Sequence, residues 1–105
     1  MIFNLGAGVD ALMADRSLPD VPLVRVAVTD LTARMTEYVV LHVLRYHRRM
    51  PELEALQHRA EWVELESPPA WERRVGILGL GVLGSDAAKK LSGLGFDVAG
   101  WSNHA

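Results

Sequence analysis

The chain has no cysteine and almost no excess of either charge. Without thiols it can form neither disulfides nor thiolate metal sites, which is compatible with a reducing compartment. Its 11 Lys and Arg residues against 13 Asp and Glu residues leave a net charge of −2, so nothing favours nucleic acid or an anionic membrane as a partner. No apolar run reaches the ~20 residues that cross a bilayer, and the first residues lack the basic region of a secretory signal. We therefore expect a soluble, globular, cytoplasmic protein.

A glycine-rich segment is the most informative feature that is present. Residues 75–84 read Val-Gly-Ile-Leu-Gly-Leu-Gly-Val-Leu-Gly, a short apolar run that enters a G-x-G-x-x-G turn. In such a turn Gly79 permits the tight bend, and Gly81 lets a pyrophosphate approach the backbone. Gly84 allows the following helix to pack closely on the strand. The segment predicts a dinucleotide cradle.

The motif is weak evidence by itself, because glycine-rich turns are common. The elements on either side of it therefore determine whether it indicates a dinucleotide site. A β-branched strand precedes it over residues 75–78, and apolar residues at helical spacing follow it up to a stop at Gly95. Residues 96–101 then predict a return strand, which completes a βαβ unit of about 30 residues. The amides of Val82 and Leu83 would face the phosphates, where the helix dipole favours an anion. The alternative is a βαβ turn whose glycines serve packing alone.

Upstream of this unit the pattern predicts two short strands and two longer helices, and a further short helix can begin at residues 9–13. Strands are expected at residues 2–5 and 23–28, and helices at about 33–50 and 52–62. Either Asp30 or Thr32 can cap the first helix. A proline-bearing break at residues 66–70 separates this region from the βαβ unit.

Aromatic and histidine side chains in this region are interpreted as structural. Trp62 and Trp71 are expected to pack rather than to stack on a ligand. His42 and His47 lie five apart, which is not the i, i+4 spacing of a metal pair, and His58 belongs to another element. No metal site is expected.

Two separated segments carry a resemblance to a known family. The first is Asn4-Leu5-Gly6-Ala7-Gly8-Val9-Asp10, at the end of a strand, and the second is Arg34-Met35-Thr36-Glu37-Tyr38-Val39-Val40, which opens a helix. Together with the glycine motif they closely resemble the D-isomer-specific 2-hydroxyacid dehydrogenases, and within them the glyoxylate/hydroxypyruvate reductase A branch. The likeness covers almost the whole chain. It disfavours another two-domain dehydrogenase, such as an amino-acid or adenosylhomocysteine-type enzyme.

The resemblance implies an α/β fold with a partial Rossmann-type βαβ dinucleotide-binding unit. The end of a flavodoxin-like substrate domain and an interdomain helix would precede this unit. Residues 1–32 would be the C-terminal piece of the substrate (catalytic) domain, and residues 33–70 the interdomain helices and linker. Residues 71–105 would be the first βαβ of the NAD(P)-binding domain.

The resemblance also implies a substrate loop. Family members hold the substrate carboxylate with backbone amides, and the matching residues here are Gly6, Ala7, Gly8 and Val9. Glycines permit a backbone nest that donates to an anion at any pH; the alternative is an ordinary turn after a strand. Thr36 matches the start of the interdomain helix near the nicotinamide, and a helix-capping role is its alternative.

The adenosine end of the coenzyme is expected after the second strand, at Trp101, Ser102 and Asn103. Sites that prefer NAD usually place Asp or Glu about 20 residues past the motif, whereas this chain has Ser102, 18 residues after Gly84. Without a carboxylate to repel a 2′-phosphate, and with a hydroxyl to donate to it, NADP is favoured and NAD is possible. Asn103 departs from the arginine common in the branch, so the preference should be weak.

The family's catalytic histidine, carboxylate and arginine all lie downstream of the second strand. The resemblance therefore implies a fragment, truncated at both ends, of an NADPH-dependent reductase of glyoxylate or hydroxypyruvate. We expect it to be inactive alone, and to be marginally folded or to self-associate. The alternative is a non-catalytic nucleotide-binding or interaction fragment that pairs with a full-length relative through the helix at residues 33–50.

Overall fold

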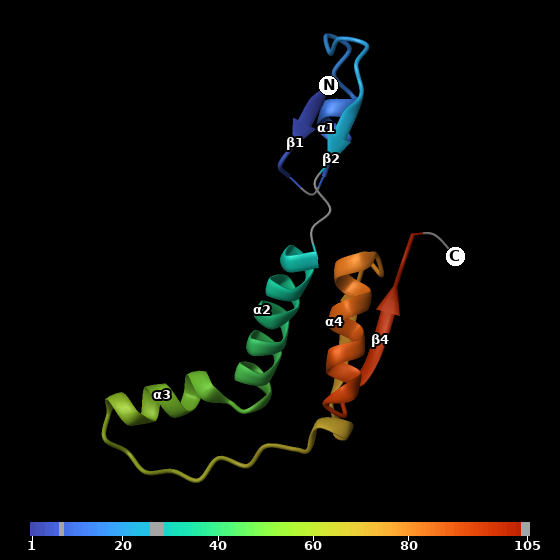
Figure 1. The fold of residues 1–105 in the computed structure, drawn as a ribbon. Coiled ribbons are helices and arrows are strands. Elements are labelled where there is room, and N and C mark those ends of the chain that lie inside the picture. The colour runs from blue at the N-terminus through green and yellow to red at the C-terminus, as the bar shows by residue number, and fades with distance from the viewer. Residues whose placement is uncertain (7, 26–28, 104–105) are drawn as a thin grey trace. The chain divides into compact units, whose positions relative to one another are not determined.

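The computed structural model describes residues 1–6, 8–25 and 29–103 (Figure 1). The chain divides into two compact units, Met1–Leu31 and Thr32–Ala105. This division lies close to the expected boundary after residue 32, while the assignment of the first unit to a substrate domain stays a prediction.

The first unit is a small β-α-β arrangement. It consists of β1 (Ile2–Asn4), α1 (Asp10–Met13) and β2 (Leu23–Arg25). The two strands are parallel, with Ile2 opposite Leu23. Both strands were expected, and the last residues predicted for the second, 26–28, lie outside the described residues.

Two helices open the second unit, and both differ from their predicted bounds. The first, α2 (Thr29–His47), begins four residues before Ala33. Asp30 therefore lies in the first turn of α2 rather than at its cap, and Thr32 is helical too, so both predicted caps are wrong. The helix ends where Arg49 adopts a left-handed conformation with φ 55°. Glycine is the residue usually found in this conformation at the end of a helix.

The next helix, α3 (Met50–His58), has a proline in its first turn, where the missing amide costs no hydrogen bond. It ends four residues before the expected Trp62. Residues 61–69 continue without regular secondary structure to a short 3₁₀ helix, η1 (Ala70–Glu72). Trp62 in this connector is 98% exposed and Trp71 in η1 is 73% exposed, so the expectation that both tryptophans pack is wrong in this chain.

The predicted βαβ unit is confirmed. It consists of β3 (Arg74–Leu78), α4 (Val82–Gly93) and β4 (Asp97–Trp101). The strands are parallel and run in register from Arg74 opposite Asp97 to Leu78 opposite Trp101. Gly95 has φ +93° and takes the chain out of α4, as its position predicts.

The apolar core is small and belongs to this βαβ unit. Ala87 and Leu91 of α4 are buried together with Phe96, and Leu91 is completely inaccessible. β3 and β4 form a two-stranded sheet, and α4 packs on both strands. Leu78, at the end of β3, is 87% exposed. Among the described residues, no helix is long and apolar enough to cross a membrane.

Candidate nucleotide-binding site

The turn from β3 into α4 has the geometry of a dinucleotide cradle. Gly79 has φ +96°, a conformation that residues with a side chain rarely adopt. Its amide donates to the carbonyl of Trp101 at 2.8 Å, which ties the turn to the carboxyl end of β4. The turn and the end of β4 therefore lie at the same edge of the sheet.

Gly84 is required for the packing of α4 against β3. A Cβ at this position would lie 1.9 Å from the carbonyl oxygen of Gly79 and 3.3 Å from Cγ2 of Ile77. Gly81 is different, because a Cβ there would meet no heavy atom within 4 Å. Packing within the chain therefore explains the glycine at 84 and leaves the glycine at 81 without a structural reason, as expected where a ligand approaches the backbone.

The first turn of α4 presents its amides at this edge. Ser85 N–H donates to the carbonyl of Gly81 at 2.9 Å, closing the first turn. The amides of Val82, Leu83 and Gly84 precede that bond and, as in any α-helix, have no intrahelical partner. Their position and the helix dipole favour an anion.

Ser85 is a site residue that the sequence reasoning missed. Its hydroxyl donates to the carbonyl of Leu80 at 2.8 Å, which fixes the turn between Gly79 and the helix. The sequence does contain a signal for this role. A serine four residues after the second glycine of a G-x-G turn lies within hydrogen-bond reach of the loop backbone.

The residues expected at the adenosine end follow β4 directly. Trp101 ends the strand and is 59% exposed, and Ser102 and Asn103 are exposed beyond it. Because parallel strands end at the same edge, these residues lie on the side of the sheet where the glycine turn is found. Gly100 precedes them, and a Cβ there would lie 2.7 Å from both terminal carbons of Leu80.

Thr36 does not lie at the start of its helix. It lies within α2 and is buried. Its hydroxyl donates to Oδ2 of Asp86 in α4 at 2.6 Å. The capping alternative is therefore wrong, because α2 begins seven residues earlier. Thr36 links α2 to the second turn of α4.

The expected substrate loop is organised by a residue that sequence reasoning did not single out. The side-chain amide of Asn4 donates to the carbonyls of Gly6 at 3.1 Å and Gly8 at 2.7 Å. In return, its Oδ1 accepts from the Gly6 amide at 3.2 Å, so that amide is already engaged. Val9 precedes α1 and accepts from the Met13 amide at 2.8 Å, and Ala7 lies outside the described residues.

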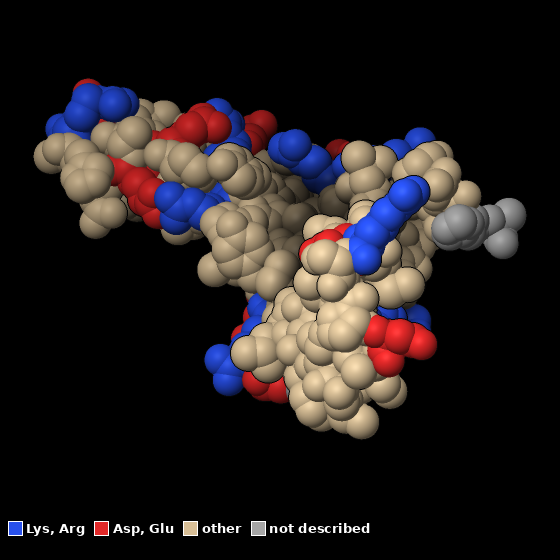
Figure 2. Space-filling model, turned by 90° about the horizontal axis from the view of Figure 1, so that it is seen from above, with Lys and Arg blue, Asp and Glu red and all other residues tan. Residues whose placement is uncertain are grey.

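Among the described residues, charge indicates no second candidate site. On the face shown in Figure 2, basic and acidic side chains are interspersed rather than gathered in one patch. Among the described residues, no group of three or more His, Cys, Asp or Glu side chains could hold a metal ion.

Comparison with known proteins agrees with this geometry. Residues 40–105 match the family model described as D-isomer specific 2-hydroxyacid dehydrogenase, NAD binding domain. The chain belongs to this family. The predicted family and the partial Rossmann-type fold are thereby confirmed.

Two curated relatives are named glyoxylate/hydroxypyruvate reductase A. The one from Serratia proteamaculans is 43% identical and the one from Yersinia enterocolitica 46% identical, each over 107 residues. In both cases the match covers 96% of this chain and 34% of the relative. The chain therefore spans about a third of the length of these dehydrogenases.

Solved structures of the family match equally well. An NADPH-dependent glyoxylate/hydroxypyruvate reductase from Sinorhizobium meliloti, in complex with NADP and sulfate, has a TM-score of 0.90 and 48% identity, covering 98% of this chain and 33% of that one. A D-isomer specific 2-hydroxyacid dehydrogenase from Xanthobacter autotrophicus, in complex with NADPH and MES, has a TM-score of 0.89 and 46% identity. This match covers 97% of this chain and 33% of that one.

Proposed function

We propose that this chain supplies the phosphate-binding part of an NADPH-dependent reductase that converts glyoxylate or hydroxypyruvate to the corresponding hydroxy acid. The observation that carries the proposal is the open position at Gly81 beside the unpaired amides of α4. The relatives named for this activity and crystallised with NADP or NADPH support it.

The residues present fit the pyrophosphate of the coenzyme. The amides of Val82, Leu83 and Gly84 would donate to its oxygens, and the glycine at 81 leaves room for it. When bound, the coenzyme supplies the hydride that reduces the keto acid. The chain itself positions the diphosphate and neutralises part of its charge.

Preference for NADP would come from the end of β4. Ser102 and Asn103 offer a hydroxyl and an amide to a 2′-phosphate and place no carboxylate there to repel it. Neither brings a positive charge, so we propose a modest preference for NADPH over NADH.

The loop after β1 would hold the substrate carboxylate. Because Asn4 engages the amide of Gly6, the donors we propose are the amides of Gly8 and Val9. Asn4 then acts by holding the loop in shape through its bonds to the Gly6 and Gly8 carbonyls. Thr36 stays a predicted neighbour of the nicotinamide, with its hydroxyl hydrogen directed to Asp86.

Residues 1–105 on their own would bind coenzyme without reducing the keto acid, because the resemblance places the catalytic histidine, carboxylate and arginine downstream of β4. A non-catalytic role in partnership with a longer relative is the second candidate, favoured by the exposed apolar side chains of α2, including Tyr38 and Leu41. The cytoplasmic location also stays a prediction.

Calorimetric titration with NADPH tests the proposal. Gly81→Ala should weaken binding at least about tenfold, because the added methyl group lies where the pyrophosphate approaches, while the backbone at 81 (φ −70°) suits alanine. Gly93→Ala is the matched control, since it also lies on α4 and its Cβ also meets nothing within 4 Å.

The control should bind like the unmodified chain, and NADH should bind more weakly than NADPH. Equal affinities of the Gly81→Ala and Gly93→Ala variants would reject the cradle, and tighter binding of NADH would reject the NADP assignment.

A further inference from the structure

Contacts in both halves of α2 join this helix to the βαβ unit. In its first half, the hydroxyl of Thr36 donates to Oδ2 of Asp86 in α4 at 2.6 Å. At its end, the ring of His47 packs edge-on against Phe96, which follows α4, with the ring centroids 5.0 Å apart. The earlier residue of α2 thus meets the earlier residue of the βαβ unit, and the later meets the later. The helices α2 and α4 therefore run in the same direction.

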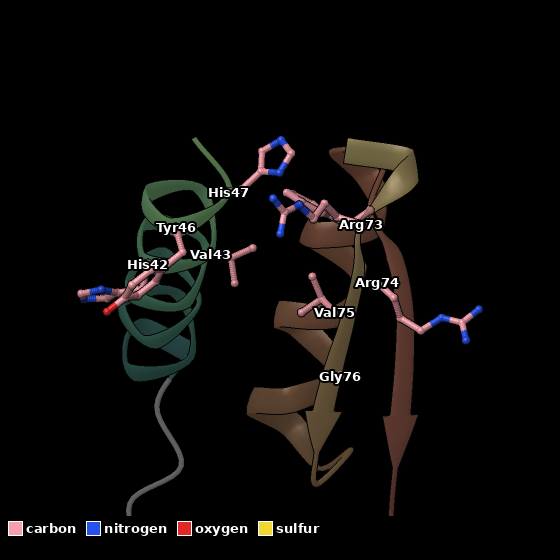
Figure 3. Close-up of a pocket in the computed structure, with 9 residues that line it drawn as sticks. His42, Val43, Tyr46, His47, Arg73, Arg74, Val75 and Gly76 are labelled. Atoms are coloured by element: carbon pink, nitrogen blue, oxygen red, sulfur yellow. The ribbon is translucent and has the colours of Figure 1, made fainter. Parts of the chain in front are cut away.

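Between these contacts α2 runs beside β3. Val43 of α2 and Val75 of β3 point toward one another across a groove of about 420 Å³ (Figure 3). In the same view β4 lies on the other side of β3. Because this groove is open, side-chain packing across it does little to fix the position of α2. The contacts on either side of the groove therefore carry more of that task.

The part of α2 that precedes Thr36 lies level with the phosphate-facing turn of α4. Thr32 precedes Thr36 by four residues, and Val82 precedes Asp86 by four. Four residues span about 6 Å along a helix axis. In two helices that run in the same direction and are joined at Thr36 and Asp86, Thr32 and Val82 therefore lie at about the same height. Residues 32–36 of α2 are thus neighbours of the amides that we propose bind the diphosphate.

The hydrogen bond between Thr36 and Asp86 is suited to fixing this arrangement. Thr36 is 6% exposed, so water competes little for its hydroxyl, and 2.6 Å is a typical distance for a hydroxyl that donates to a carboxylate. The two residues are 50 positions apart in the sequence, and the covalent route between them passes through the irregular connector at residues 61–69. The bond is therefore a far shorter link between the two helices than the chain itself.

The course of the bound coenzyme leads toward α2. Its adenosine end is proposed to lie at Ser102 and Asn103, beyond β4, and its diphosphate at the turn after β3. The diphosphate joins the two halves of the coenzyme, so the nicotinamide half leaves it on the side away from the adenosine half. Since β4 and α2 lie on opposite sides of β3 (Figure 3), the nicotinamide half is directed toward α2.

We propose that Thr36 and Asp86 are positioning residues of the coenzyme site. Their hydrogen bond holds residues 32–36 of α2 beside the first turn of α4, and the nicotinamide half of NADPH lies against these residues. Asp86 acts through Thr36 rather than by touching the coenzyme. This assignment rests on the proposed coenzyme function.

Titrations of the ¹⁵N-labelled chain with two ligands test this role. NADPH spans both helices, whereas inorganic pyrophosphate reaches only the amides at the start of α4. Thr36→Val removes the donor and keeps the shape of the side chain. It should weaken the binding of NADPH at least about fivefold, the scale of a lost hydrogen bond to a carboxylate, and that of pyrophosphate less than about twofold. In the unmodified chain, NADPH should shift the amide signals of residues 32–36, and pyrophosphate should leave them nearly unshifted.

Conservative and matched variants separate positioning from folding. Thr36→Ser keeps the hydroxyl and should keep the NADPH affinity within about twofold. Asp86→Asn keeps an acceptor oxygen without the charge, so it should weaken NADPH less than Thr36→Val does and leave pyrophosphate bound as tightly as before. These two variants give the same comparison if Thr36→Val fails to fold. Ser92→Ala is the control, because it removes a hydroxyl from an exposed position of α4 and should bind both ligands like the unmodified chain.

Equal weakening of NADPH and pyrophosphate would show that the bond merely stabilises α4, and it would overturn the proposal. An unchanged NADPH affinity in Thr36→Val, or NADPH that binds without shifting the amides of residues 32–36, would overturn it as well. These results differ from a failure of the proposed function, in which neither ligand binds the unmodified chain. That result would overturn both proposals together.

Discussion

At the scale of single residues, the glycines of the turn have different roles, since Gly84 serves the packing of α4 and Gly81 is proposed to serve coenzyme binding. Gly84 has the carbonyl of Gly79 where a Cβ would be, and backbone cannot yield as the end of a side chain can. Gly84→Ala should therefore lower the free energy of unfolding by about 1–3 kcal/mol, the usual cost of overpacking. Chemical denaturation checks this, with Gly93→Ala as the control. A Gly84→Ala variant as stable as the control would contradict the packing described for α4.

His47 makes the stability of the second unit depend on pH. Its folded-state pKa lies below the usual value near 6.5, chiefly because the ring is buried. Between the two values the unfolded chain binds more protons than the folded one, so stability is complete above about pH 6.5 and falls as the pH drops below it. The melting temperature should decrease from pH 7 to pH 5, and His47→Gln should flatten this decrease. A slope unaffected by His47→Gln would contradict the account.

At the scale of elements, a part-buried hydrogen bond joins α2 to α4. Thr36 donates to the Asp86 carboxylate at 2.6 Å, and Thr36 is 6% exposed. A double-mutant cycle with Thr36→Val and Asp86→Ala should give a coupling free energy of about 1–2 kcal/mol, as expected for a hydrogen bond to a charged group. Additive effects of the two substitutions, measured by denaturation, would show that the contact contributes nothing.

Ion pairs lie at the junction of α2 and α3. Arg45 binds Glu54 through two parallel hydrogen bonds of 2.7 and 2.5 Å, and Arg49 pairs with Glu52 next to the left-handed residue that separates the helices. These side chains are partly exposed, so salt should weaken their pairing.

The sequence predicts some of these elements far better than others. The βαβ unit is predictable because its signals are local: β-branched residues, a glycine turn, apolar residues at helical spacing and Gly95 at φ +93°. The start of α2 is predicted four residues too late, because both Asp30 and Thr32 suit a cap. Its end is missed because Arg49, rather than a glycine, takes the left-handed conformation.

Some residues of the candidate site are likewise easier to predict from the sequence than others. The glycines are predictable from their spacing. The structure explains Gly84 by close packing and Gly79 by its positive φ, and it leaves the position of Gly81 open. The Thr36–Asp86 pair is not predictable, because this hydrogen bond joins two helices far apart in the sequence. The hydrogen bonds of Asn4 and Ser85 are local, so these two roles could have been predicted but were missed.

At the scale of the whole molecule, the chain has a small core and many exposed apolar side chains. Ala87, Leu91 and Phe96 are the buried apolar residues of the described chain, while Phe3, Leu78 and Trp62 are largely exposed. Exposed apolar surface and unpaired strand edges favour association. The expectation of a marginally stable or self-associating chain stays a prediction, and so does its lack of turnover.

The central claim is that the amides at the start of α4 bind the diphosphate of a nicotinamide coenzyme. An NMR titration of the ¹⁵N-labelled chain with NADPH tests it most directly. The account predicts that the amide signals of Val82, Leu83 and Gly84 shift most, with Ser102 and Asn103 following and residues of α3 unchanged. Saturable binding of NADPH that leaves these three amides unshifted, or no binding at all, would contradict it.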